Sequence, residues 1–276
     1  MEKEMQFIRR ISITVTPVIG GEGLVFNDFR INFEVQKSVE KKIQNTAKIQ
    51  IYNLSDNSFN FIKQNNMAVT IKVGWGEEAD KLLFFGKINR ASKEKKDTDW
   101  IIKIESGDSG NAYNSAKLSK SYPEKTTHNN VFEDLKNELL KGNIIKGIKG
   151  FFASDNLFNN GFTAHGNVGN LMDNILTANN YEWQINNGIL EIQKKGTSNQ
   201  VIKLSSESGL VDSPEVTENG IKATCLLQPE ISPLRQVYVE SLYIKGVYIP
   251  SKVTHSGDNL EGKFITTFET GEKKKK

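Results

Sequence analysis

The sequence contains little of what a catalytic or metal site usually requires. It has one cysteine, Cys225, which excludes an internal disulfide and fits a protein made in a reducing compartment. Its three histidines, His128, His165 and His255, are scattered, and neither an HxxxH motif nor a Cys/His cluster occurs. A zinc site would have to be assembled from distant segments, so we predict no metal ion and no cofactor.

Long apolar runs and a large excess of charge are also missing. No run of about 18 apolar residues occurs, so we expect no membrane span and no stable membrane association. The N-terminus lacks the sustained apolar stretch of a signal peptide. A net charge of +3 is too small to indicate a nucleic-acid partner, and we expect no sequence-specific nucleic-acid binding. With 276 residues, the chain is long enough for more than one domain.

Residues 1–120 show the two-residue period of β-strands. The segment FRINFEV places four apolar residues on one face, and these are Phe29, Ile31, Phe33 and Val35. The segments AKIQIYNL, VTIKVGW, LLFFGKINR and DWIIKIES follow the same pattern, and turn formers and charged residues separate them. One short helix, capped by Ser55, interrupts the series. We predict an antiparallel sheet that closes on itself as a barrel or sandwich.

Residues 121–198 predict a small α+β domain. Apolar residues at helical spacing follow Thr127, a candidate N-cap, and end before Gly142, a candidate C-cap. A second helix is expected to begin at Asn167 and to end at Asn179-Asn180. Directly after it, Asn186-Asn187-Gly188 between two short strand-like segments indicates a β-hairpin.

Residues 199–270 return to the β pattern and repeat the order of the first region. GIKATCLL takes the place of AKIQIYNL, and RQVYVES takes the place of VTIKVGWG. The long hairpin from FFGKINR to DWIIKIES corresponds to the segment from VYIPSKVTH to KFITTFET. The pattern therefore predicts two copies of one β module around the α+β domain, and residues 271–276 are expected to form a solvated, lysine-rich tail.

The motif HSGDN brings His255 and Asp258 close together in the sequence. Such a pair could be catalytic or could bind a metal, or it could belong to the tip of a hairpin. It occupies the position that ASKEKKDTD fills in the first β region, and Gly, Asp and Asn are turn formers. We therefore predict a hairpin turn at residues 256–259, with positive φ at Gly257.

The remaining candidate residues favour structural roles. Cys225 alternates with apolar residues in ATCLL and is predicted to be buried, without the electropositive setting that a nucleophile needs. Glu77 and Glu78 lie in a predicted turn, although sequence alone does not exclude a pair of carboxylates across a cleft. Most aromatic residues fit core positions, and Trp75 is the best candidate for an exposed binding platform. We assign no catalytic, cofactor-binding or metal-binding residue and predict that the protein is not an enzyme.

The order of these segments resembles baseplate hub proteins of tailed bacteriophages, the tail hub family that includes late-control-protein-D-like proteins. Three segments carry the resemblance: the FFGKI strand before a hairpin that ends in ESGD at Asp108, the helix followed by YEWQINNGILEIQ, and GVYIPSKVTHSGDN. Relatives of this family occur in phage-derived contractile injection systems. The resemblance implies a mainly β fold, with two similar antiparallel β-barrel domains of tail-tube type flanking a helix-containing α+β domain. The chain stops just past the last expected strand, so we expect no lysozyme-like, spike or extension domain after it.

The resemblance also implies a function in virus assembly. Three chains would form a homotrimeric ring that joins the six-fold tail tube to the three-fold central spike, because each chain supplies two similar surfaces. The implied partners are a tail tube protein or tube-like adaptor, the central spike, baseplate wedge proteins, and the tape measure protein in the lumen. The expected location is the tail baseplate of the virion, after assembly in the cytoplasm of the host bacterium.

Other functions remain open at this point. A distal tail or tube-terminator protein would share a related barrel, and the hub of a contractile injection system would share the whole architecture. An enzyme or carbohydrate-binding protein built on β domains would instead need a cleft with perturbed carboxylates or exposed aromatic residues.

Overall fold

The computed structural model describes residues 8–39, 44–76, 79–108, 116–141, 145–198, 201–218 and 220–270. Gly142, Glu77 and Glu78, and the tail at 271–276 lie outside the described residues, so their predicted roles stay predictions. The chain forms two compact units. The β unit combines residues 1–40, 45–107 and 198–276, and the α+β unit comprises residues 41–44 and 108–197. None of the described helices is long and apolar enough to cross a membrane.

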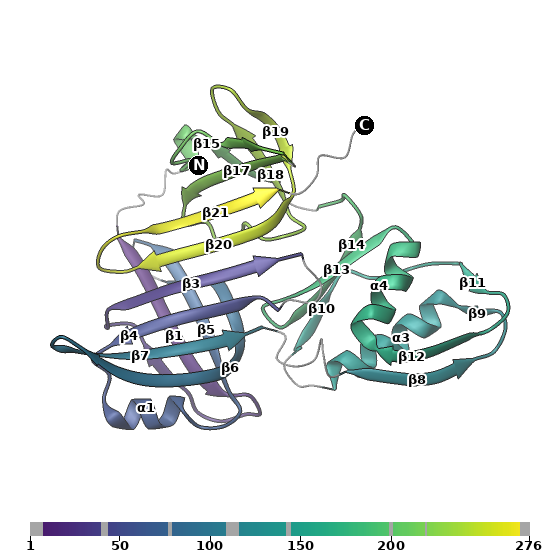
Figure 1. The fold of residues 1–276 in the computed structure, drawn as a ribbon, viewed down its shortest axis with the longest axis horizontal. Coiled ribbons are helices and arrows are strands. Elements are labelled where there is room, and N and C mark those ends of the chain that lie inside the picture. Colours follow the sequence, from purple (N-terminus) through teal and green to yellow (C-terminus); the bar gives the residue numbers. More distant parts are fainter. Residues whose placement is uncertain are drawn as a thin grey trace. The chain divides into compact units, whose positions relative to one another are not determined.

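The described residues of the first half of the β unit form seven strands and one helix (Figure 1). Their bounds are β1 (Arg9–Pro17), β2 (Leu24–Phe26), β3 (Ile31–Ser38), β4 (Thr46–Tyr52), α1 (Asp56–Ile62), β5 (Met67–Trp75), β6 (Lys81–Lys96) and β7 (Asp99–Gly107). Buried residues alternate along β3 and β4, as the sequence predicts, because one face of each strand packs on the core. Ser55 caps α1 by accepting a hydrogen bond from the Ser58 N–H, which confirms the predicted cap.

The second half of the β unit is smaller. Its elements are β15 (Val201–Ser205), the short 3-10 helix η1 (Ser206–Ser208), β16 (Glu215–Thr217), β17 (Gly220–Leu226), β18 (Gln236–Glu240), β19 (Lys245–Tyr248), β20 (Pro250–Asp258) and β21 (Phe264–Thr270). Its core lies between two groups of strands. Ile202 and Val237 pack from β15 and β18, and Ala223, Val253 and Phe268 pack from β17, β20 and β21.

One sheet of 11 strands runs through both halves, in the order β16-β17-β21-β20-β3-β4-β7-β6-β5-β1-β2. Figure 1 shows β20 of the second half beside β3 of the first half, followed by β4 and β7. The structure confirms a mainly β fold. Among the described residues, however, no pairing joins β1 or β2 back to β3, so hydrogen bonds do not close the predicted barrels. Instead the sheet curls around a core to which β1, β3, β4, β5, β6 and β7 all contribute.

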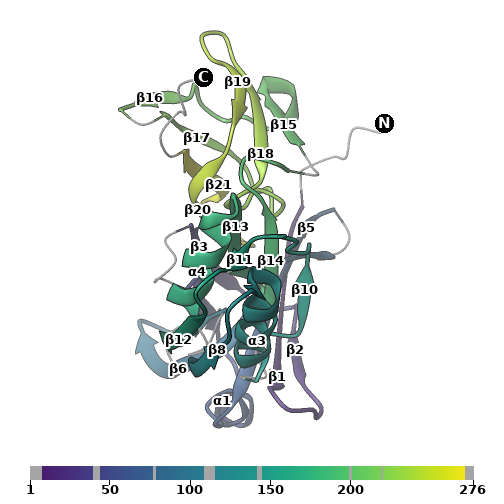
Figure 2. The same ribbon diagram turned by 90° about the vertical axis from the view of Figure 1, so that its right-hand side faces the viewer.

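The described residues of the α+β unit pair short strands with the helices α3 and α4, which Figure 2 shows in a second view. Its elements are β8 (Lys117–Tyr122), β9 (Thr126–Thr127), α3 (His128–Leu140), β10 (Gly147–Lys149), β11 (Leu157–Phe158), β12 (Phe162–Asn167), α4 (Val168–Ala178), β13 (Tyr181–Asn186) and β14 (Ile189–Lys194). Strand β8 pairs with β12, β9 pairs with β11, and β14 lies between β10 and β13.

Local sequence signals specify this unit well. Thr127 and Asn167 are the N-caps of α3 and α4, and each side chain accepts a hydrogen bond from the N–H three residues later. Asn179 is the C-cap of α4. Asn187 and Gly188 both have positive φ and connect β13 to β14, so the predicted hairpin is confirmed.

Candidate assembly edges and the joint between the two β halves

The two halves of the β unit meet where β3 pairs with β20, and we call this pairing the joint. It runs antiparallel from Ser38 opposite Lys252 to Asn32 opposite Asp258. Val35 of β3 is fully buried opposite His255. The joint therefore links strands that are more than two hundred residues apart in the sequence.

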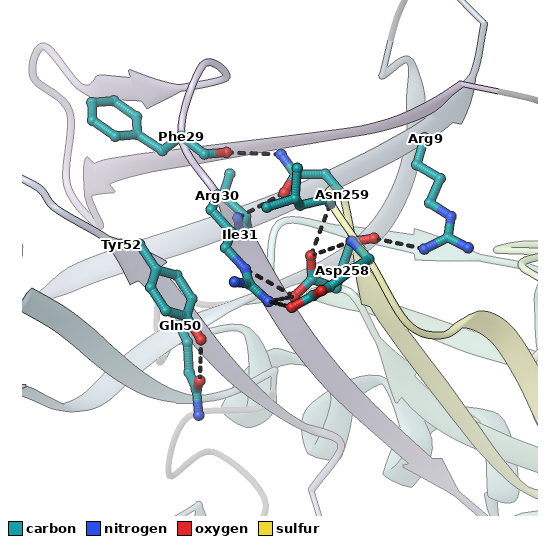
Figure 3. A network of polar contacts seen from close by, with 10 residues as sticks. Arg9, Phe29, Arg30, Ile31, Gln50, Tyr52, Asp258 and Asn259 are labelled. Carbon is teal, nitrogen blue, oxygen red and sulfur yellow. Dashed lines mark hydrogen bonds and ion pairs between the residues drawn. The ribbon is translucent and has the colours of Figure 1, made fainter. Parts of the chain in front are cut away.

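Asp258 holds one end of the joint as a carboxylate (Figure 3). Its Oδ1 accepts hydrogen bonds from the N–H groups of Leu260 and Glu261 at 2.8 and 3.1 Å, and its Oδ2 lies 3.2 Å from Nη2 of Arg30. Burial alone would raise the pKa of this carboxyl group. The two backbone N–H groups and the Arg30 guanidinium outweigh burial and lower the pKa below its ordinary value. Asp258 is therefore an ionised carboxylate that stabilises the end of the joint, and it is not a proton donor.

Asn259 ties the same end to the first half (Figure 3). Its side-chain oxygen accepts a hydrogen bond from the Ile31 N–H at 2.9 Å, and its amide nitrogen donates to the Phe29 carbonyl at 2.7 Å. Nη1 of Arg9 donates to the Asp258 carbonyl at 3.2 Å. These bonds satisfy backbone groups where the strands end, so the HSGDN motif is part of the structure of the joint.

The HSGDN residues belong to a hairpin, but the predicted position of the turn is wrong. Strand β20 continues to Asp258 and β21 begins at Phe264, so the turn spans residues 259–263. Gly262 has the positive φ, of 73°, and Gly257 is an ordinary strand residue. A side chain at Gly257 would place its Cβ 2.6 Å from the Phe33 ring, so the glycine permits close packing rather than a turn.

His255 is completely buried within β20 and does not form a catalytic pair with Asp258. Its Nδ1 lies 2.8 Å from Oγ1 of Thr266. Burial, followed by the charge of Lys37, lowers the pKa of the imidazole well below its ordinary value. His255 is therefore a neutral core residue of the joint.

The other histidines lie in the α+β unit. Nδ1 of His128 is 2.8 Å from the Asn179 amide nitrogen, and burial lowers the pKa of this histidine. Nδ1 of His165 lies 3.2 Å from the Ser119 hydroxyl, on the exposed β12–β8 pair. Within the described part of the chain, no three His, Cys, Asp or Glu residues are grouped as a metal site.

Cys225 and Trp75 both contribute to packing. Cys225 is fully buried, as predicted, and burial raises the pKa of its thiol to about 12. Trp75 packs edge-to-face on Phe264, with ring centroids 4.9 Å apart, and its indole N–H donates to the Leu227 carbonyl at 3.3 Å. The tryptophan thus joins the two halves and is not an exposed platform.

An open groove of about 550 Å³ follows the solvent face of the joint. Two of its acidic residues, Asp258 and Glu261, both bind Arg30, at 3.2 and 2.5 Å. Glycoside hydrolysis needs two carboxylates across a cleft, one of which has a raised pKa. Because the pKa of Asp258 is lowered and both carboxylates engage one arginine, the groove is a poor match to such a site.

The two halves use the same order of strands. In the first half the sheet runs β3-β4-β7-β6-β5-β1. In the second half it runs β16-β17-β21-β20, and β19, β18 and β15 follow in a separate sheet. Strand β6 pairs with β5 up to Lys87 and with β7 from Lys87 onward, while β19 pairs with β18 and β20 pairs with β21. Strand β6 of the first half thus corresponds to β19 and β20 together.

The correspondence extends to charged residues on the solvent face. In the first half, Glu34, Lys48, Glu105 and Arg90 lie opposite one another on β3, β4, β7 and β6. In the second half, Glu215, Lys222, Glu269 and Lys252 do the same on β16, β17, β21 and β20. In both halves the register shifts by one residue just before the last cation. We call these two rows the charge ladders.

The ladders were not predicted from the sequence, although it contains a signal for them. The acidic pairs lie in FEV and PEV and in IES and FET, and the basic pairs lie in AKI and IKA and in NRA and SKV. Each charged residue occupies the outward position of its strand. The core positions beside them differ, for example Ile51 and Cys225.

Solved structures with a similar fold are phage tail and secretion-system proteins. A tail protein from Neisseria meningitidis MC58 aligns over 96% of this chain and 97% of its own length, with a TM-score of 0.62 and 10% identity. The 43 kDa tail protein of prophage MuSo2 from Shewanella oneidensis aligns over 95% and 98%, with a TM-score of 0.62 and 10% identity.

A third similar structure comes from a secretion system. The E. coli c3393 protein aligns over 87% of this chain and 72% of its own length, with a TM-score of 0.61 and 10% identity. It is described as a component of the type VI secretion system with structural similarity to the T4 bacteriophage tail proteins gp27 and gp5. At such low identity these likenesses concern the fold.

A search of curated protein sequences finds no match. A family model for baseplate hub gp41, in contrast, matches residues 10–267, nearly the whole chain. The chain therefore belongs to the baseplate hub gp41 family, and it is a structural phage tail protein rather than an enzyme.

Proposed function

We propose that this chain acts as a baseplate hub by forming a trimeric ring that joins the six-fold tail tube to the three-fold central spike. The observation that carries the proposal is the correspondence of the two β halves, strand by strand and charge by charge. A closed ring requires that each contact be met by a repeated surface. A chain with two similar halves offers six such surfaces in a trimer, and it presents them without needing a second gene product.

The charge ladders would line the channel of this ring. In each half the ladder faces away from the core, so a ring with its cores outside turns both ladders inward. Each ladder has two acidic and two basic residues, so the band carries no net charge. Such a lining would let a tape measure protein or DNA pass without strong retention, because it offers no basic stripe.

The partners follow from the two symmetries. The six similar surfaces would meet a tail tube protein or tube-like adaptor, and the three-fold side would meet the central spike, with wedge proteins outside. The protein would assemble in the cytoplasm of the host bacterium and would remain in the tail baseplate of the virion. Membership of a baseplate family supports this location.

The mass of the purified protein in solution tests the proposal. Native mass spectrometry and light scattering over a range of concentrations should detect trimers of the 31.0 kDa chain, and electron microscopy should show rings with three-fold symmetry. Added tube or spike protein should increase the trimer fraction. A chain that stays monomeric at high concentration with both partners present would contradict the proposal. A hexamer would instead indicate a distal tail or tube-terminator protein.

The hub of a phage-derived contractile injection system is the second candidate. The observation that favours it is the similarity in fold to a type VI secretion component. Both candidates predict a trimer, so the genes beside this one would distinguish them.

A further inference from the structure

The joint supplies a template for how a second chain could bind. Strand β3 meets β20 over seven register positions, from Ser38 opposite Lys252 to Asn32 opposite Asp258. Backbone bonds continue past both ends, from the Val39 N–H to the Ser251 carbonyl at 2.9 Å and from the Asn259 N–H to the Ile31 carbonyl at 3.2 Å. At the joint, β3, the strand at one end of the sheet order of the first half, therefore pairs with β20 from the hairpin of the second half.

The counterparts of these two strands each keep a free edge. Strand β16 corresponds to β3, and it pairs only with β17 among the described residues. The outer half of β6, residues 88–96, corresponds to β20, and within the described chain it pairs only with β7. Unpaired edges of this kind are templates for the strand of another chain.

Val216 shows the consequence for one side chain. It stands at the position of β16 that Val35 occupies in β3, one residue after the acidic residue of the ladder. Val35 is 0% exposed, since it packs in the core of the first half and pairs with His255 of β20, whereas Val216 is 78% exposed. A strand placed on the β16 edge in the manner of the joint would bring Val216 into the position that Val35 has.

We infer that β16 of one subunit pairs antiparallel with residues 88–96 of β6 in the next subunit, with Thr217 opposite Ser92 and Val216 opposite Lys93. This contact, which we call the seam, rests on the proposed trimer and names the edges that close it. Each chain contributes eight strands from β16 to β6, so three chains joined by three seams form one continuous cylinder of strands.

The charges near the seam suit a contact between subunits. In the joint, Lys37 and His255 lie close together, and the lysine charge disfavours protonation of the histidine. In the seam the same positions hold Glu218 and Lys93, which have opposite charges and lie diagonally across the two strands. Nζ of Lys93 also lies 2.5 Å from Oδ1 of Asp56 in its own chain, so it would be shared between two carboxylates. In the joint, the histidine of the pair stays neutral beside Lys37. In the seam, the two corresponding side chains carry opposite charges and attract each other.

Two other positions limit how far the seam extends. Pro214 stands where β3 has Phe33, and because proline lacks an N–H the ladder of backbone bonds stops there. Glu94 and Glu215 come opposite each other, but Glu94 already binds Lys103 at 2.5 Å and Glu215 lies opposite Lys222 on β17. The seam is therefore short, with its pairs between residues 214 and 218.

A cysteine pair in the full chain tests the register. Ser92→Cys combined with Thr217→Cys should give disulfide-linked trimers under mild oxidation, seen by electrophoresis without reductant. The matched reference is Gln36→Cys with Thr254→Cys, the same position in the joint, which should cross-link within one chain. Glu94→Cys with Thr217→Cys is the off-register control. The native Cys225 is fully buried and does not compete.

Each outcome bears on the seam in a different way. Cross-linked trimers from the in-register pair, with little product from the off-register pair, support it. Trimers by mass without this cross-link overturn the seam but leave the proposed function standing. Equal cross-linking of both pairs overturns the register. A chain that is monomeric under all conditions overturns the seam together with the trimer.

An exposed side chain gives a second readout. Val216→Lys should weaken trimer formation about tenfold or more, because a buried lysine would face Lys93 across the seam. Val25→Lys is the control, since Val25 is 57% exposed on the edge strand β2 at the other end of the sheet. The control should assemble normally and both variants should fold. Equal assembly of the two variants would overturn the seam.

Discussion

The hairpin of the second half and the hairpin of the first half occupy the same place in the strand order, yet their residues differ sharply. Positions 255, 257 and 258 of β20 hold a histidine, a glycine and an aspartate, all buried against β3. The corresponding residues of β6 are Lys93, Lys95 and Lys96, with the last two exposed. One edge is covered by β3 within the chain, whereas the lysines of the other suit an edge that faces water.

A second contrast concerns the path of the strand itself. Strand β6 is continuous over 16 residues and belongs to both parts of its sheet, while the second half breaks the same path between β19 and β20. Pro250 stands at the break, and it has no N–H for the ladder. The outermost pairs differ as well, because β1 lies antiparallel to β5 and β15 lies parallel to β18. The strand order can therefore be kept while the sheet divides.

Adding a methyl group at the covered hairpin should destabilise the β unit more than any other change considered for the two halves. Gly257→Ala should lower the free energy of unfolding of the β unit by about 1–3 kcal/mol, because the new Cβ would lie 2.6 Å from the Phe33 ring and 2.8 Å from Phe264. Lys95→Ala, at the same place in the first half, should change it by less than about 0.5 kcal/mol. Denaturant titration followed by tryptophan fluorescence measures both. Equal losses would show that the two positions do not differ in burial.

Sequence reasoning succeeded where a local signal determines the structure. Alternation predicted the buried faces of β3 and β4, and side chains at Ser55, Thr127 and Asn167 predicted helix starts. The repeated order of segments predicted that the two β regions correspond. These features depend on a few neighbouring residues, so a single sequence contains the information.

Reasoning failed where distant strands decide the environment. His255 and Lys37 are polar by type, yet both are buried because β3 pairs with β20, a contact that no local pattern encodes. Gly257 was interpreted as a turn residue because glycine serves both turns and close packing, and only the positions of Phe33 and Phe264 distinguish these roles. The charge ladders require the register across four strands, which the sequence alone does not supply.

A smaller effect is a dependence of stability on pH, which is expected from His255 in the second half. The pKa of His255 is lowered in the folded protein, so the imidazole stays neutral there while the unfolded chain binds a proton below its ordinary pKa of about 6.5. Stability is therefore full above that pH and is lost as the pH falls below it, by up to about 1.4 kcal/mol per pH unit.

His255→Gln should remove this slope from the unfolding of the β unit between about pH 6.5 and 5.5. His165→Gln is the matched control, because His165 lies in the α+β unit and His255 is the one histidine of the β unit. Denaturant titrations at the two pH values, compared with the unchanged chain, give the slope. A slope that survives in the His255 variant would place the responsible group elsewhere.

The smallest effect tests whether the two charge ladders are equivalent. Lys48→Glu places three carboxylates in a row with Glu34 and Glu105, and Lys222→Glu does the same with Glu215 and Glu269. Each opposed pair should cost about 0.2–1 kcal/mol, so both variants should lose similar stability, and added salt should reduce the loss.

The control is an exposed lysine with no charged residue opposite it, Lys72→Glu, whose cross-strand neighbours are Ser12 and Leu82. If Lys48→Glu lowers the free energy of unfolding no more than Lys72→Glu does, the charges of the first ladder do not interact measurably. If only one ladder variant shows a cost, the correspondence of the two halves is limited to strand order.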